Sequence, residues 1–237
     1  MTPVIAFRGV GHTYGARAVL RDVTLEIGAG EIYGLAGANG SGKTTLLRAA
    51  AGAFHPSSGS LSVTGMTGYV AQRFSLYEDL PVEENLVFFA RCYGLSGRAL
   101  ETAVRGVMER FDLNDWRRTP TGVLSHGWKQ RVAMAAALCH EPQVLILDEA
   151  TSGIDLEARF QIWDVLAECA RSGVGIILAT HDMEEAARCD RVGYLQGGRL
   201  IVSDSVAEVR ARCASGLGRE PDSLTEALAW IAKEAAR

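Results

Sequence analysis

A glycine-rich stretch at residues 37–44 constrains the fold of this chain more than any other segment. It reads Gly-Ala-Asn-Gly-Ser-Gly-Lys-Thr. The apolar run 32–36 before it favours a strand, and residues 43–51 carry the apolar spacing of a helix. A strand, a glycine loop and a helix in this order allow backbone N–H groups to surround phosphate oxygens at a helix N-terminus. The stretch therefore predicts an α/β fold with a P-loop NTPase core.

The same stretch predicts a nucleotide site. Lys43 is expected to neutralise the β and γ phosphates, and Thr44 to offer its hydroxyl to Mg²⁺. A chance glycine-rich turn is the alternative, but the flanking strand and helix disfavour it. The residues expected to contact the nucleotide here are Gly37, Asn39, Gly40, Ser41, Gly42, Lys43, Thr44 and Thr45.

Two carboxylates follow a second apolar run, residues 144–147. A buried strand there would deliver Asp148 and Glu149 to its carboxyl end, where open α/β sheets bind their ligands. Asp148 is expected to complete the surroundings of Mg²⁺, together with Thr44. A pair of solvated acids at the end of a strand is the alternative.

The rest of the chain alternates strands and helices around one core. Short β-branched segments at 4–10, 23–27, 60–63 and 66–70 predict strands, and the first two are expected to pair as antiparallel strands. A helical pattern runs from Pro81 to about residue 113, and an Ala-rich helix is expected after Trp128. Further strands are expected at 144–147 and 175–179, with a helix between them. We predict one domain over residues 1–237: a mostly parallel sheet, an N-terminal antiparallel β subdomain, and a helical subdomain inserted at about 74–122.

Composition excludes several classes. The formal net charge of −4 and a pI of about 5.8 argue against a nucleic-acid partner. The apolar runs are far shorter than the roughly 20 residues needed to span a bilayer. Five scattered cysteines and the lack of a signal-peptide pattern favour a cytoplasmic location.

Residues 124–131 read Leu-Ser-His-Gly-Trp-Lys-Gln-Arg and narrow the class further. Together with the phosphate loop and the paired acids, they resemble the ATP-binding domain of ABC transporters. That family has a Leu-Ser-Gly-Gly-Gln signature, so His126 and Trp128 replace its first glycine and its glutamine. The resemblance implies that Ser125 and Gly127 contact the γ-phosphate of ATP held by a second copy. A helix cap without this role is the alternative.

The resemblance also assigns catalytic roles. Glu149 matches the glutamate that activates the attacking water, and His181 matches the switch histidine at the γ-phosphate. Gln72 matches the glutamine that senses Mg²⁺ or the water. A core histidine and a surface glutamine are the respective alternatives for His181 and Gln72.

Two further residues match binding positions of the family. Tyr14 matches the aromatic residue that stacks on adenine, although it could be a turn aromatic packed on the core. Asp155 matches a loop residue that reaches across the dimer, and it could equally cap the following helix.

By this resemblance, two such domains pair head to tail around two MgATP and drive a separate transmembrane permease subunit. The chain would then lie at the inner face of the membrane. The segment from Gly59 to Gln72 and the residues after it are most similar to the exporters of drugs and other solutes. Two alternatives remain open: a soluble ABC ATPase such as an iron–sulfur assembly subunit, and a regulatory nucleotide-binding module with weak turnover.

Overall fold

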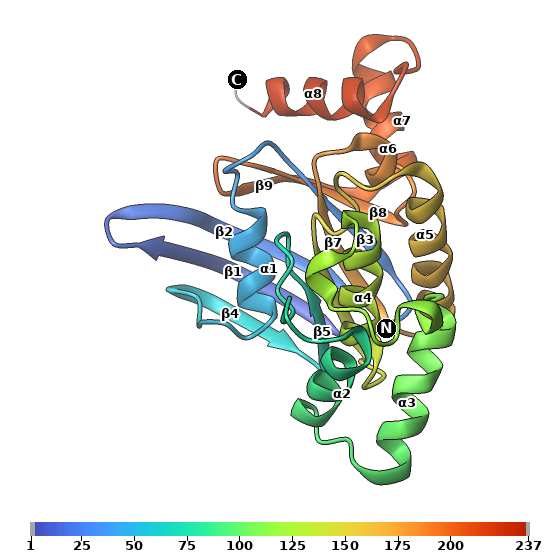
Figure 1. The fold of residues 1–237 in the computed structure, drawn as a ribbon. Helices are drawn as coiled ribbons and strands as arrows, with labels where there is room; N and C mark the ends of the chain where they lie inside the picture. Colours follow the sequence, from blue (N-terminus) through green and yellow to red (C-terminus); the bar gives the residue numbers. More distant parts are fainter. Residues whose placement is uncertain (1–2, 236–237) are drawn as a thin grey trace.

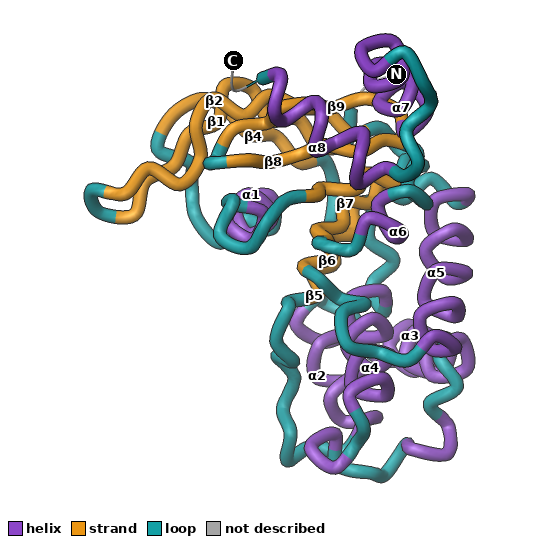
Figure 2. Tube along the Cα trace, turned by 90° about the horizontal axis from the view of Figure 1, so that it is seen from above, coloured by secondary structure: helices purple, strands orange, loops and turns teal. Residues whose placement is uncertain are grey.

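The molecule has two arms joined at an angle (Figure 2). The computed structural model describes residues 3–235. Most strands gather in one arm. The other arm contains α2 (Val82–Cys92), α3 (Gly97–Arg110) and α4 (His126–Leu138), which pack against one another.

The chain opens with an antiparallel sheet of β1 (Ile5–Tyr14), β2 (Arg17–Ile27) and β4 (Ser58–Val63), in the order β2-β1-β4. The predicted antiparallel start is therefore confirmed, but 4–10 was too short for the first strand. The pairing shifts register at a bulge that contains Gly9, whose φ of 61° suits glycine, and the strand continues to Tyr14.

A second sheet of six strands forms the centre of the domain (Figure 1). Its order is β5 (Thr67–Val70), β6 (Val144–Asp148), β7 (Gly175–Thr180), β3 (Ile32–Ala36), β8 (Arg191–Gln196) and β9 (Arg199–Ser205). All neighbouring pairs are parallel except the β8–β9 hairpin, which confirms a mostly parallel sheet. The carboxyl ends of β3, β5, β6 and β7 consequently meet at one edge.

Alternate residues of the central strands enter two different cores, which explains why these strands are continuously apolar. One face packs against the arm of helices and α5 (Leu156–Arg171). The other packs against α1 (Lys43–Ala50) and the antiparallel sheet. In β6 and β7 the first face presents Leu145, Leu147, Ile176 and Leu178, and the second presents Val144, Ile146, Ile177 and Ala179.

Two expected helix starts were wrong. Pro81 occupies the N-cap of α2 instead of its first turn, and α4 begins at His126, two residues before Trp128. Three further helices follow β7: α6 (Met183–Ala186), α7 (Val206–Leu217) and α8 (Leu224–Glu234). The apolar stripe of α8 packs on β9 and α6. Within residues 3–235, no helix is long and apolar enough to cross a membrane.

Candidate functional site

The loop between β3 and α1 contains the expected phosphate-binding backbone. Gly42 has a φ of 111°, and a Cβ there would lie 3.0 Å from the carbonyl oxygen of Val19. A Cβ on Gly37 would lie 2.5 Å from the carbonyl oxygen of Leu195. Both positions therefore require glycine, since a larger residue would force the loop to move.

The loop also holds a buried polar atom that suits an anion. The hydroxyl of Ser41 is buried, and it has no hydrogen-bond partner in the described part of the chain. A buried hydroxyl without a hydrogen-bond partner destabilises the folded protein unless a ligand or water supplies one. A phosphate oxygen at the N-terminus of α1 would do so, and the residues present therefore fit a nucleotide phosphate.

Lys43 is held at the centre of the site. It is buried at the first turn of α1, and its ammonium group donates to the carbonyl oxygen of Gly37 at 2.8 Å. The same nitrogen lies 3.4 Å from Oε1 of Glu149. The lysine is thus fixed between the phosphate loop and the acid at the end of β6.

Glu149 gathers three of the predicted residues. Its Oε2 accepts a hydrogen bond from Nε2 of Gln72 at 3.0 Å and lies 3.3 Å from Nδ1 of His181. Its backbone has a φ of 52°, a left-handed conformation that costs a non-glycine residue about 1 kcal/mol or more. The backbone conformation that directs this carboxylate toward the site therefore lowers the stability of the fold.

Asp148 is placed for a cation together with Thr44. The threonine hydroxyl donates to Oδ1 of Asp148 at 3.1 Å. Burial raises the pKa of the Asp148 carboxyl, and the hydrogen bond from Thr44 partly opposes that rise. A hydroxyl and a carboxylate are oxygen donors of the kind Mg²⁺ prefers, so the donor set fits this ion.

Tyr69 is a residue of the site that the sequence did not reveal. Its hydroxyl lies 3.5 Å from Oδ2 of Asp148, and burial followed by the charge of Asp148 raises the tyrosine pKa to about 12. Its position three residues before Gln72, on the strand paired with β6, could have suggested this contact.

A cavity of about 420 Å³ extends from Lys43, Thr44, Gln72 and Glu149 to the antiparallel sheet. Tyr14 is half exposed at its outer end, where His12 and Phe54 pack against its ring. Arg17 and Val19 also line the cavity, and neither was expected. The remaining lining residues are Asn39, Gly40, Gly42, Lys43, Thr44, Thr45, Gln72 and Glu149.

Five residues predicted to contact the nucleotide do not line this cavity. Two of them, Gly37 and Ser41, belong to the phosphate loop beside it, and the other three lie at the starts of α4 and α5. Ser125 is the N-cap of α4, and Gly127 lies in its first turn. Asp155 is the N-cap of α5, and its Oδ1 accepts from the amide of Ala158 at 2.9 Å. The capping alternative for Asp155 is therefore confirmed, and Ser125, Gly127 and Asp155 lie outside the lining of the cavity.

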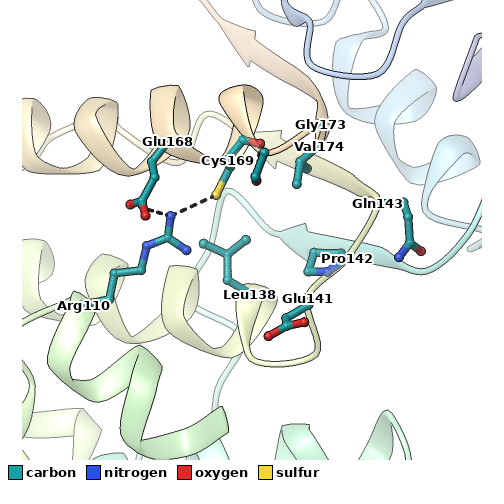
Figure 3. A pocket seen from close by; sticks show the side chains of 10 residues that line it. Arg110, Leu138, Glu141, Pro142, Gln143, Glu168, Cys169, Gly173 and Val174 are labelled. Carbon is teal, nitrogen blue, oxygen red and sulfur yellow. Dashed lines mark hydrogen bonds and ion pairs between the residues drawn. The ribbon is translucent and has the colours of Figure 1, made fainter.

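A groove of similar size lies at the opposite edge of the sheet, between α3, α4 and α5 (Figure 3). It is next to the amino ends of β6 and β7, where open α/β sheets do not place their ligands. Its main cation, Arg110, donates to Glu168 at 2.9 Å and to the sulfur of Cys169 at 3.4 Å. The arginine of this groove is therefore already paired, whereas the hydroxyl of Ser41 in the phosphate loop is not paired within the described residues.

The comparisons with known proteins agree with this geometry. A family model described as ABC transporter matches residues 20–152. A probable multidrug ABC transporter ATP-binding protein, YbhF of Escherichia coli K12, is 38% identical in an alignment of 235 residues that covers 94% of this chain and 40% of that protein. A Nod factor export ATP-binding protein I of Burkholderia lata is 35% identical, covering 97% of this chain and 81% of that protein.

Two solved structures are similar as well. An ATP-binding subunit of an ABC transporter superposes with a TM-score of 0.86 at 29% identity, covering 99% of this chain and 100% of the other. A dimeric ATP-binding cassette in a post-hydrolysis state, bound to ADP and Pi, has a TM-score of 0.78 at 25% identity, covering 85% and 98%.

The chain belongs to the ABC transporter family and has the fold of its ATPase domains. The predicted class and fold are thus confirmed. The chain spans less than half the length of the Escherichia coli relative. Its transport activity and partners are therefore matters of proposal.

Proposed function

We propose that this chain is the ATP-hydrolysing subunit of an ABC exporter, and that it works as a head-to-tail dimer around two MgATP. The observation that supports this most is the position of Glu149, which contacts Lys43, Gln72 and His181 beside a glycine-built cavity. The names of the relatives, a multidrug transporter subunit and a Nod factor exporter subunit, support the export direction.

In this proposal the phosphate loop binds the triphosphate, and Tyr14 stacks on the adenine. Thr44 and Asp148 hold Mg²⁺, which when bound neutralises phosphate charge and polarises the γ-phosphoryl group. Glu149 orients and deprotonates the attacking water, and Gln72 holds that carboxylate in place. His181 donates to the γ-phosphate oxygens as charge develops.

The second copy would complete the site. Ser125 and Gly127 stand at the N-terminal end of α4, whose backbone N–H groups and dipole favour an anion. They would approach the γ-phosphate held by the other copy. Loss of the γ-phosphate on hydrolysis would then weaken a contact shared by both copies, and the dimer would open.

The membrane partner would dock beside the Gln72 loop. Tyr77 and Phe88 are 51% and 40% exposed, and their rings pack edge to face at 5.0 Å. Asn85 fixes the loop, because its side chain bonds both the amide and the carbonyl of Tyr77 at 2.9 Å. An exposed aromatic pair on a rigid base suits a short helix of a transmembrane permease subunit, which would hold this chain at the inner face of the membrane.

ATPase assays and affinity purification test this function. The purified chain should hydrolyse ATP in the presence of Mg²⁺, and the Glu149→Gln protein should form dimers only when ATP is added. From detergent-solubilised membranes the chain should co-purify with a polytopic protein, and Tyr77→Ser/Phe88→Ser should lose that protein while still binding ATP. Recovery of soluble partners alone would favour an assembly subunit, and absent turnover with normal ATP binding would favour a regulatory module.

A further inference from the structure

The N-termini of α4 and α5 lie against each other. A Cβ added to Gly127 would lie 3.6 Å from Oδ2 of Asp155 and 3.7 Å from the Cβ of Ala158. The start of α4 therefore lies close to the first turn of α5, with space for about one methyl group between them at Gly127. The loop 152–155 that leads into α5 lies in the same region of the surface.

His126 connects these two elements through its side chain. Its Nε2 lies 3.0 Å from the carbonyl oxygen of Ser152, 26 residues further along the chain. A carbonyl oxygen can only accept, so His126 donates, and its proton is on Nε2. The exposed imidazole thus links the first residue of α4 to the loop before α5.

Gly153 lies beside this link. Its φ is 73°, a left-handed conformation that suits glycine, and a Cβ there would lie 3.7 Å from Cδ2 of the imidazole. The imidazole ring of His126 therefore lies against residues 152–153. The imidazole, which is bonded to Ser152, is directed toward the loop before α5.

We propose that His126 is a positioning residue that fixes the loop 152–155 to the altered signature, so that Ser125, Gly127 and Asp155 meet a second copy as one preset surface. A surface ordered before association loses less conformational entropy on binding. This inference rests on the proposed function, since it concerns the face offered to the other copy's ATP. It assigns His126 no contact with the nucleotide.

Two substitutions separate the link from the bulk of the side chain. His126→Gly removes the donor and restores the glycine common in the family. His126→Gln keeps a donor nitrogen the same number of bonds from the backbone, and it should rescue. Both substitutions are made in the Glu149→Gln protein, so that ATP hydrolysis does not cause the dimer to dissociate.

The ATP concentration for half-maximal dimerisation is measured by analytical ultracentrifugation, and ATP binding to the monomer is measured at low protein concentration. His126→Gly should raise the ATP concentration for half-maximal dimerisation about 3- to 10-fold, the loss expected for one hydrogen bond. The affinity of the monomer for ATP should not change. His126→Gln should stay within about twofold of the parent protein, a factor smaller than the loss of one hydrogen bond. Equal dimerisation of all three proteins, or equal loss in both variants, would overturn the inference.

Hydrogen exchange separates this inference from the proposed function. Amides of residues 152–155 should exchange faster in His126→Gly than in His126→Gln, with or without ATP. If no variant dimerises with ATP, the proposed dimer fails while a difference in exchange still supports the link. Identical exchange in both variants rejects the link whatever the dimer does.

Discussion

Lys43 and Glu149 form an ion pair across the site, with 3.4 Å between Nζ and Oε1 and only 4% and 9% of the side chains exposed. The two residues come from the first turn of α1 and from the loop after β6. Their contact joins the phosphate loop to the proposed base, so it bears on both stability and turnover.

The first prediction concerns the stability of this pair. Lys43→Met should lower the free energy of unfolding by about 3 kcal/mol, the lower end of the range for breaking a buried pair, because Gln72 still bonds the remaining carboxylate. Lys43→Met/Glu149→Gln should lose less than Lys43→Met alone, since no buried charge is then left unpaired. Urea unfolding without nucleotide measures both.

A half-exposed pair provides the matched control. Lys129, whose side chain is 18% exposed, lies 3.0 Å from Glu78, whose side chain is 61% exposed. Lys129→Met should cost less than about 1 kcal/mol, as exposed pairs do. An equal loss for the Lys43 and Lys129 variants would contradict the view that burial makes the first pair important.

The second prediction concerns turnover. Glu149→Gln should reduce the ATPase rate by about 10²- to 10⁴-fold, the usual contribution of a general base. The neutral amide has the same shape, so ATP should still stabilise the protein against heat. Glu157→Gln, an exposed acid at the start of α5, is the control and should keep the parent rate. Substantial hydrolysis by Glu149→Gln would show that another group activates the water.

The third prediction concerns the adenine end of the cavity. Tyr14→Ala should weaken ATP binding by about 5- to 100-fold, because base stacking on an aromatic ring contributes roughly 1–3 kcal/mol. Tyr14→Phe keeps the ring and its packing against His12 and Phe54, and it should bind as the parent does. Titration with a fluorescent ATP analogue measures both. Equal binding by the alanine and phenylalanine variants would remove Tyr14 from the site.

Much of the site followed from local sequence. The strand, loop and helix around residues 37–44 and the acids after 144–147 are each specified within about a dozen residues, and the parallel sheet brings their ends together. The resemblance assigned Gln72, Glu149 and His181 to one site, but it did not predict that Glu149 contacts the other two, since no local pattern sets distances between residues so far apart in sequence.

The missed features depend on geometry between distant segments. The continuation of β1 to Tyr14 needs a bulge at Gly9, which a pattern of short β-branched runs does not contain. The link from His126 to Ser152 needs two helix N-termini to lie side by side. Tyr69 reaches Asp148 only because β5 pairs with β6. The spacing of residues in the sequence specifies each helix and strand, but it does not specify these contacts between distant segments.

The fourth prediction concerns the segment that carries His181. The hydroxyl of Thr180 donates to Oε2 of Glu185 at 2.8 Å and accepts from the amide of Asp182 at 2.9 Å. Both neighbours of His181 in the sequence are therefore held by hydrogen bonds. Glu185 is buried in α6, while His181 is half exposed. We therefore expect Glu185 to hold the backbone from which His181 reaches the site.

Glu185→Ala should lower kcat about tenfold, since the loss of one hydrogen bond and its geometry corresponds to roughly 1.4 kcal/mol. The KM for ATP should change little, because the phosphate loop is untouched. Glu185→Gln keeps an oxygen that can accept from Thr180 and should retain most of the activity, and Glu184→Ala, at an exposed position beside it, should behave as the parent. Adding His181→Ala to Glu185→Ala should cause little further loss if Glu185 acts through the histidine. Additive losses in the double variant would instead show that Glu185 acts by a separate route.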